Sequence, residues 1–323
     1  MRKFRSPLRR PVALAAMLLL SVVSVGAVMA GSAPAAGSRQ PNDCETAHHG
    51  GTDGPNPFAG VCDYLDTREG VVQGALFDQT TGRTYRVSNG DDTQYTASIV
   101  KADILARWLR RFQKRGVPIP DGIHYSIKYL MQRMIQNSDN AAATALFHFG
   151  GGCDALTRFN THIPMDDTKV GCETPTYYGW GNTTTTSADQ VRLMRVLAYG
   201  DRRLLGPDAR SYGTGLMESV EPDQRFGISC GPWGDSCDPP DYAHPDPDVT
   251  VALKNGWKPL PSCSGSPEEC PWQVNSIGWV HGAGRNYVLA VLTTGNPAAS
   301  GVLYGYGIDT IQNVSKRVWH NLG

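Results

Sequence analysis

The order of strand-like and helix-like segments most constrains what this chain can fold into. Two short strand-like runs flank a glycine turn within residues 71–87, and stretches of helical periodicity fill most of residues 98–197. The remaining predicted elements are three strands and a final helix, at 249–253, 272–280, 286–294 and about 301–321. Strands at both ends of a chain around a helical middle predict an α+β domain, with a helical part inserted into a discontinuous sheet.

The first 30 residues have the organisation of a signal peptide. A basic start is followed by an almost wholly apolar run from Val12 to Ala30 and then by small residues. These zones in this order predict an export signal that is removed, and not a membrane span. Arg9-Arg10 would also suit a twin-arginine signal, but Pro11 follows, and ordinary secretion fits better. We therefore expect a secreted protein that is free of the membrane after cleavage.

The charge balance after cleavage excludes one class of partner. Residues 1–30 hold five basic residues and no acidic residue, so 25 basic and 30 acidic residues remain, a net charge of −5. A nucleic-acid partner would need clustered positive charge, so we expect none. Residues 31–54 are rich in Gly, Ser, Pro and Ala and predict a flexible linker, which leaves residues 55–323 for one domain.

All 8 cysteines lie in the exported part of the chain, and an even number there predicts disulfides. Spacing alone does not fix the connectivity. The pairs that proximity suggests are Cys44 with Cys62, Cys153 with Cys172, Cys230 with Cys237, and Cys263 with Cys270. None of the cysteines is spaced like a set of zinc ligands, and we expect no metal and no cofactor.

The helix predicted at 98–115 carries a lysine among its apolar side chains. Because successive helical residues point about 100° apart, one apolar stripe consists of Ile104, Leu105, Trp108, Leu109 and Phe112. The opposite face, which we expect to be wet, carries Asp103, Arg107, Arg110, Arg111 and Lys114. Lys101 falls in the middle of the apolar stripe. A buried ammonium loses its hydration, so its pKa falls and the neutral amine can accept a proton.

Ser98 lies three residues before Lys101, on the same side of the first helical turn. A serine hydroxyl becomes a nucleophile when a base lies within hydrogen-bond reach. The start of a helix also offers free backbone N–H groups that can stabilise an oxyanion. The alternative is that Lys101 reaches solvent at the helix end and Ser98 only caps the helix.

Two further segments bear on this choice. Ser138-Asp139-Asn140 lies between two predicted helices, and Lys254-Asn255-Gly256 ends the strand predicted from residue 249. At average residue frequencies, a given tripeptide arises by chance in a chain of this length roughly a few per cent of the time. Taken alone, the first segment would suit a helix cap and the second a surface turn.

In this order, the three segments resemble the motifs of the serine beta-lactamase and penicillin-binding superfamily, namely Ser-x-x-Lys, Ser-Asp-Asn and Lys-Thr-Gly. The resemblance is closest to the class A enzymes and spans most of residues 60–320. The threonine run within 182–187 and the pair Gly151-Gly152 are also similar to that family. The resemblance implies a three-layer α/β/α sandwich of an antiparallel sheet with flanking helices, plus an inserted all-α subdomain. Its implied boundaries are an α/β part at about 55–95 and 200–323, and a helical part at about 96–199.

The resemblance also implies roles for matching residues. Ser98 would attack the substrate carbonyl and become acylated, while Lys101 would take its proton, directly or through water. Ser138 would relay a proton to the leaving nitrogen. Asn140 would hold both the amide side chain of the substrate and Lys101.

Further roles fall on the strand near residue 254. Lys254 would support Ser138 electrostatically and attract the substrate carboxylate, next to Asn255 and Gly256 of the same motif. The backbone N–H groups of Ser98 and Trp257 would form the oxyanion hole.

Two positions depart from the family pattern. Asn255 stands where the family usually has Thr or Ser. Its amide can still donate to a carboxylate, but the geometry would change, and this leaves the substrate preference open. Glu173 lies about where the family places the acid that activates the deacylating water, 33 residues after Asn140. However, Thr176 and Tyr177 follow it instead of Leu-Asn. Glu173 is either this base or a solvated loop acid.

Three functions remain under consideration. The first is hydrolysis of beta-lactams, with a part in antibiotic resistance. The second is a D,D-peptidase or penicillin-binding activity on cell-wall D-alanyl peptides, and the third is non-catalytic binding of such peptides. The intact set of Ser98, Lys101, Ser138 and Asn140 favours an enzyme. In each case we expect a small-molecule or peptide ligand and a monomeric protein.

Overall fold

The computed structural model describes residues 45–49, 55–90, 93–172, 179–200, 203–237 and 242–323. The expected signal peptide and most of the expected linker lie outside these residues. The helices and strands are β1 (Glu45–His49), α1 (Val61–Leu65), β2 (Val71–Asp78), β3 (Arg83–Ser88), β4 (Gln94–Tyr95), η1 (Ala97–Ile99), α2 (Val100–Lys114), α3 (Tyr125–Gln136), α4 (Asn140–Phe149), α5 (Gly152–Asn160), η2 (Gly179–Asn182), β5 (Thr184–Thr185), α6 (Ser187–Ala198), α7 (Pro207–Glu218), η3 (Pro222–Gln224), β6 (Val249–Pro259), β7 (Trp272–Gly282), β8 (Arg285–Asn296) and α8 (Gly305–Asn321).

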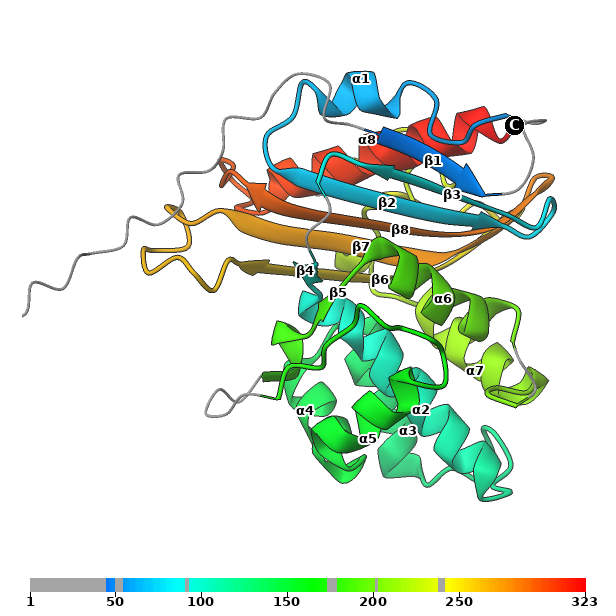
Figure 1. Cartoon of the computed structure of the whole chain (residues 1–323). Helices are drawn as coiled ribbons and strands as arrows, with labels where there is room; N and C mark the ends of the chain where they lie inside the picture. Colours follow the sequence, from blue (N-terminus) through cyan, green and yellow to red (C-terminus); the bar gives the residue numbers. More distant parts are fainter. Residues whose placement is uncertain (1–44, 50–54, 91–92, 173–178, 201–202, 238–241) are drawn as a thin grey trace, which may run out of the picture. The chain divides into compact units, whose positions relative to one another are not determined.

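An antiparallel sheet of six strands, in the order β1-β3-β2-β8-β7-β6, brings the two ends of the domain together (Figure 1). Strands β2 and β3 precede the helical region and β6 to β8 follow it, as the sequence predicted. Strand β1 lies within the segment 31–54, which we had expected to be a linker. A short second sheet pairs β4 with β5, so the chain just before Ser98 is bonded to the threonine run.

Both faces of the large sheet are covered by helices. In β8, Val288, Ala290 and Leu292 belong to one apolar cluster, whereas the alternating Leu289 and Val291 belong to another. This period of two follows from the pleat of a strand, whose successive side chains point to opposite faces. Helix α8 packs on β7 and β8 on one face, and α6 packs on β2 and β8 on the other (Figure 1). The three-layer α/β/α sandwich is therefore confirmed.

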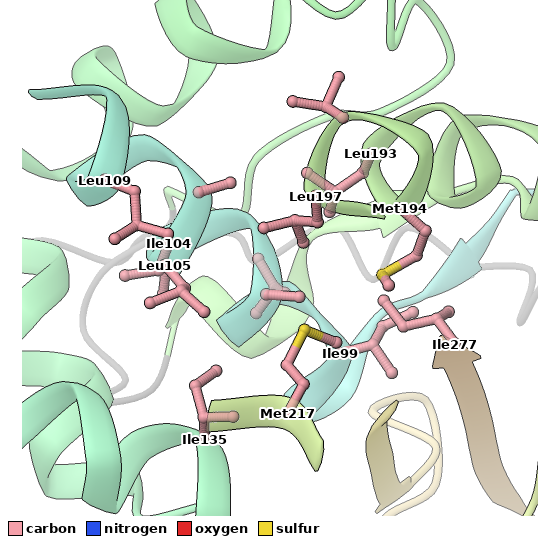
Figure 2. Close-up of a cluster of buried hydrophobic side chains, with 14 of the residues drawn as sticks. Ile99, Ile104, Leu105, Leu109, Ile135, Leu193, Met194, Leu197, Met217 and Ile277 are labelled. Carbon is pink, nitrogen blue, oxygen red and sulfur yellow. The ribbon is translucent and has the colours of Figure 1, made fainter. Parts of the chain in front are cut away.

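The core between the sheet and the helical part surrounds the start of α2 (Figure 2). Ile99, Leu105, Leu197, Met217 and Ile277 come from five different elements, and none of these side chains is exposed to solvent. Full burial of each such side chain stabilises the fold by about 1.5–3 kcal/mol. The position of residues 97–101 is thus fixed by packing from both the helices and the sheet.

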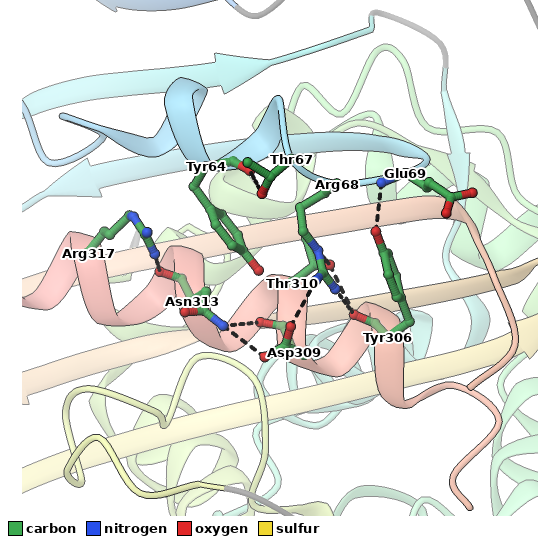
Figure 3. A network of polar contacts seen from close by, with 9 residues as sticks. All are labelled: Tyr64, Thr67, Arg68, Glu69, Tyr306, Asp309, Thr310, Asn313 and Arg317. Atoms are coloured by element: carbon green, nitrogen blue, oxygen red, sulfur yellow. Dashed lines mark hydrogen bonds and ion pairs between the residues drawn. The ribbon is translucent and has the colours of Figure 1, made fainter. Parts of the chain in front are cut away.

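On the outer face, the segment that follows α1 is bonded to α8 (Figure 3). The Arg68 guanidinium donates to Thr310 Oγ1 at 3.0 Å and to the Tyr306 carbonyl at 2.9 Å, and forms an ion pair with Asp309 at 3.1 Å. The same guanidinium lies 3.7 Å from the centroid of the Tyr306 ring, whose hydroxyl accepts from the Glu69 backbone N–H. These contacts attach the N-terminal helix to the C-terminal one.

Helix α7 is an element that the sequence analysis did not predict. It begins with Pro207 at a first-turn position, where proline is favoured. Gly213 and Gly215 lower its intrinsic helix propensity, but Leu109 of α2 and Leu197 of α6 pack against Gly213. Packing against these helices therefore maintains the helix despite the weak local signal.

Three of the four suggested disulfides are present: Cys153–Cys172, Cys230–Cys237 and Cys263–Cys270. Cys62 is also disulfide-bonded, and its suggested partner, Cys44, lies outside the described residues. Among the residues that the structure describes, none of the helices is both long and apolar enough to cross a membrane.

Candidate active site

The amine of Lys101 is the centre of a group of polar contacts. It lies 2.9 Å from Ser98 Oγ and 3.1 Å from Ser138 Oγ, and it donates to Asn140 Oδ1 at 2.7 Å and to the Ser138 carbonyl at 2.5 Å. The Lys101 side chain is 0% exposed. The first two motifs therefore meet at one buried nitrogen, and the alternative in which Lys101 reaches solvent does not describe this structure.

Burial, together with charge repulsion from the nearby Lys254, lowers the pKa of Lys101 from 10.5 to about 6. The carboxylate of Asp139 acts in the opposite direction but is a smaller influence. At neutral pH the Lys101 amine is therefore mostly uncharged. A neutral amine at hydrogen-bond distance from a hydroxyl can accept the hydroxyl proton.

Ser98 lies in the 3₁₀ turn η1, which is pressed against strands β6 and β7. A Cβ atom on Gly256 would lie 2.6 Å from the Ser98 backbone nitrogen and 2.9 Å from the Thr96 carbonyl oxygen, so only glycine permits this approach. Opposite Gly256 in the sheet, the Asn275 amide donates to the carbonyls of Tyr95 and Thr96 at 2.8 and 3.0 Å. The sheet thus fixes the backbone that carries the Ser98 hydroxyl.

Ser138 and Asn140 are positioned by the start of helix α4. Asp139 caps this helix by accepting from the Ala142 backbone N–H at 2.9 Å, and it forms an ion pair with Arg133 at 3.0 Å. The cap at Asp139 therefore has the role that its residue type predicts. It holds the residues on either side of it against Lys101.

Two residues of this region have left-handed backbone conformations that side chains rarely adopt. Ala97, which precedes the Ser98 turn, has a φ of 46°, and Ser138 has a φ of 55°. Such conformations cost about 1–3 kcal/mol each and persist only where the surroundings enforce them. Ser138 contacts the Lys101 amine, and Ala97 precedes Ser98, which also contacts it. Strained backbone is commonly found at functional sites.

The third motif, Lys254-Asn255-Gly256, contributes two buried side chains that have different hydrogen-bond partners. Lys254 is 1% exposed, and burial lowers the pKa of its amine to about 7. This amine donates to the Asn255 carbonyl at 2.7 Å. The Asn255 amide donates instead to the carbonyls of Gln224 and Phe226, at 2.8 and 3.0 Å. Its NH₂ group is therefore engaged with backbone in this structure, and not directed to a carboxylate.

Trp257 adds an aromatic side chain next to this strand segment. Its indole stacks on the Tyr304 ring, with ring centroids 4.9 Å apart and planes at 20°. It also packs edge-to-face with Phe226, with ring centroids 5.4 Å apart. Tyr304 immediately precedes helix α8. The stack thus joins the strand beyond Gly256 to the C-terminal part of the chain.

Trp180 is a neighbour of Lys101 that sequence reasoning missed. Its ring centroid lies 5.1 Å from the Lys101 amine, and its indole N–H donates to Thr144 Oγ1 at 3.1 Å. The Trp180 side chain is 4% exposed.

Among the described residues no carboxylate forms an ion pair with Lys101. Glu173, the suggested deacylating acid, lies outside the described residues.

Comparisons with solved structures identify the fold. A beta-lactamase from Xanthomonas campestris pv. campestris has a TM-score of 0.61 and 20% identity, over 83% of this chain and 97% of that chain. A class A beta-lactamase from Bacteroides cellulosilyticus has a TM-score of 0.65 and 17% identity, over 84% and 99%. A variant of PBP-A, as its acyl-enzyme complex with penicillin G, has a TM-score of 0.61 and 19% identity, over 82% and 95%. No curated protein matches the sequence.

The family comparison covers the larger part of the sequence. Residues 115–322 match the beta-lactamase enzyme family, Beta-lactamase2. The matched region contains Ser138, Asn140 and the 254–256 segment, and it begins after Ser98 and Lys101. The fold, the order of the three motifs and this match agree. The chain belongs to the beta-lactamase enzyme family.

Proposed function

We propose that this protein is an exported serine hydrolase that opens beta-lactam or related amide bonds through an acyl-enzyme at Ser98. The observation that carries the proposal is the fully buried Lys101 amine, 2.9 Å from Ser98 Oγ and with a pKa of about 6. A hydrolase needs a nucleophile with an adjacent base, and this pair meets both requirements of distance and protonation. Export is supported by the basic and apolar start of the chain and by the disulfides.

The proposed chemistry assigns one task to each neighbour of the nucleophile. Lys101 accepts the Ser98 proton as the hydroxyl attacks the carbonyl, and the backbone N–H groups of Ser98 and Trp257 stabilise the oxyanion. Ser138 passes a proton to the leaving nitrogen. Asn140 orients both Lys101 and the substrate amide.

Lys254 supplies the remaining charge in this proposal. Burial is the main reason that Lys101 is neutral, and a protonated Lys254 adds to the effect by repulsion and attracts the substrate carboxylate. Because the Asn255 amide is hydrogen-bonded to backbone carbonyls, we assign binding of the substrate carboxylate to Lys254 and not to Asn255.

A second candidate is a penicillin-binding D,D-peptidase, which forms the acyl-enzyme but hydrolyses it slowly. The observation that favours it is the Trp180 ring, which lies 5.1 Å from the Lys101 amine, while no carboxylate of the described residues forms an ion pair with that amine. PBP-A, one of the structural relatives, has been captured as an acyl-enzyme complex with penicillin G. Non-catalytic peptide binding is the least favoured candidate, because it gives no reason for burying two lysines.

Covalent labelling by a fluorescent penicillin tests the acyl-enzyme directly. We expect the native protein to be labelled with one fluorophore per chain, and we expect Ser98→Ala to abolish labelling because the nucleophilic oxygen is gone. Ser211→Ala, on the exposed side of α7, is the matched control and should label normally. Labelling that persists in Ser98→Ala refutes the nucleophile, and an unlabelled native protein favours the binding function.

The lifetime of the penicilloyl adduct distinguishes the two hydrolytic candidates. If Glu173 positions the deacylating water, Glu173→Gln should lengthen the adduct lifetime by about ten-fold or more, because general-base catalysis is lost. Glu221→Gln is the matched control and should leave the lifetime unchanged. The measurement is the decay of the adduct in intact-mass spectra, together with turnover of a chromogenic cephalosporin. An unchanged lifetime in Glu173→Gln eliminates this acid as the base.

A further inference from the structure

A pocket away from Ser98 is lined by several positively charged side chains. It has a volume of about 340 Å³ and lies between helices α2 and α5. Its cationic side chains are Arg107, Arg110, Arg111, Lys114, Arg115 and Arg158. Four of these recur on one face of α2 at intervals of three and four residues, Arg115 follows at the end of that helix, and Arg158 lines the pocket from α5. None of the pocket residues belongs to the group around Ser98.

These cations have no anionic partners among the described residues. No carboxylate in the part of the chain that the structure describes forms an ion pair with any of the six. Instead, the Arg107 and Arg111 guanidiniums lie over the Trp108 ring, at 5.7 and 5.0 Å, and Arg110 lies over Phe159 at 5.8 Å. Arg111 also donates to the Phe149 carbonyl at 3.2 Å. The rings and this carbonyl align the guanidiniums without neutralising them.

Two nitrogen atoms of this cluster are buried without a hydrogen-bond partner, Arg107 Nη1 and Arg110 Nε. Buried polar atoms in proteins are nearly always hydrogen-bonded, so these two nitrogens in one pocket are available to donate to a bound acceptor. Burial, together with repulsion from Arg111, Arg158 and Arg115, lowers the pKa of Arg107 to about 10. A guanidinium resists deprotonation, so this repulsion persists at neutral pH unless an anion binds.

The nearest acid in sequence does not fill this role. Asp103 lies one turn before Arg107 on α2, and the sequence analysis placed it on a wet face together with these arginines. The structure corrects this prediction, because Asp103 is 1% exposed, and burial raises its pKa to about 7. It does not line the pocket. The face opposite the apolar stripe of α2 is partly covered by α5, and its arginines are half-buried as far as residue 111.

We propose that this pocket binds a compact, multiply charged phosphate anion, such as an oligophosphate, independently of the Ser98 site. Guanidinium groups match the geometry of phosphate oxygens and donate two parallel hydrogen bonds to them. A volume of about 340 Å³ is in the range of small-molecule sites. Residues 31–323 carry a net charge of −5, so the cluster is not a by-product of a basic composition.

The proposal is tested by titrating the disulfide-intact full chain with inorganic tripolyphosphate in a calorimeter and by following its melting temperature. Binding should raise the melting temperature, because the anion binds only the folded state. The apparent affinity should fall as sodium chloride is raised, because salt screens the exposed arginines. No heat of binding and no change in melting temperature would overturn the proposal.

Matched variants separate the pocket from diffuse electrostatic attraction. Replacing the exposed Arg115 and Arg158 together by Gln should weaken tripolyphosphate binding by about ten-fold or more, whereas Arg86→Gln with Lys169→Gln, also exposed, should not. Ala155→Leu fills the pocket without changing any charge and should also weaken binding. Equal weakening in the two charge variants, or normal binding in Ala155→Leu, would contradict a pocket site.

A third experiment distinguishes a free phosphate anion from a lipid headgroup, which also contains a phosphate. Vesicles that contain phosphatidylglycerol should compete poorly with tripolyphosphate, because the pocket lies between two helices. Vesicle binding without tripolyphosphate binding would overturn the proposal. Labelling of Ser98 by fluorescent penicillin should be unchanged in all the pocket variants, which also verifies that they fold.

Discussion

Lys101→Met is expected to slow acylation of Ser98 by about 10²–10⁴-fold, the range that a positioned general base contributes. Methionine has a similar length and suits a buried position, but it cannot accept the Ser98 proton. The measurement is the second-order rate constant for labelling by fluorescent penicillin at pH 7. Lys128→Met, on helix α3, is the matched control and should label at the native rate.

The same substitution should not lower the melting temperature at pH 7. The pKa of Lys101 is about 6 in the folded protein and 10.5 in the unfolded chain. Between these values the unfolded chain binds the extra proton, so this lysine favours unfolding there and its unfavourable effect diminishes as the pH rises. Near-native acylation by Lys101→Met would remove Lys101 from the mechanism.

Gly256→Ala is expected to reduce both acylation and stability. The added Cβ would lie 2.6 Å from the Ser98 nitrogen, 2.8 Å from the Ile99 nitrogen and 2.9 Å from the Thr96 oxygen. All three are backbone atoms, which cannot move aside as the end of a side chain can. We expect a loss of about 1–3 kcal/mol in the free energy of unfolding. A displacement of about 1 Å at Ser98 would lower the acylation rate by about 10²-fold.

Gly215→Ala provides the comparison for this effect. Gly215 lies in helix α7, and a Cβ there would meet no atom within 4 Å. Alanine is the better helix former, so this variant should gain about 0.5–1 kcal/mol in stability. Denaturant unfolding and penicillin labelling of both variants give the two readouts. Native-like acylation in Gly256→Ala would show that this close approach does not position the nucleophile.

The sequence predicted the elements of the fold that have strong periodic patterns. The apolar stripe of α2 and the returning strands β6 to β8 lie where the sequence placed them. The same periodicity predicted a buried Lys101, and its pKa and contacts followed from that burial. Helix α7 was missed because Gly213 and Gly215 weaken its local signal, and packing on neighbouring helices maintains it.

Contacts between distant segments could not be read from the sequence. The bonds from Asn275 to the carbonyls of Tyr95 and Thr96 join residues about 180 positions apart. The polar residue Asn275 in a buried strand was the available signal in the sequence, but its residue type alone does not predict which groups it bonds. Trp180 over Lys101 and the arginine pocket depend in the same way on tertiary packing. Asn255 illustrates the limit best, because its residue type suits a carboxylate whereas its neighbours are backbone carbonyls.

The protonation state of Lys101 decides most directly whether its amine can act as the base for Ser98. Carbon-13 labelling of the lysine Cε atoms allows the Lys101 resonance to be assigned by its absence in Lys101→Met and followed by NMR as the pH is raised. We expect the Lys101 amine to lose its proton with a midpoint near pH 6, in line with a pKa of about 6. A midpoint near the ordinary value of 10.5 would mean that the amine is charged at neutral pH and cannot take the proton of Ser98.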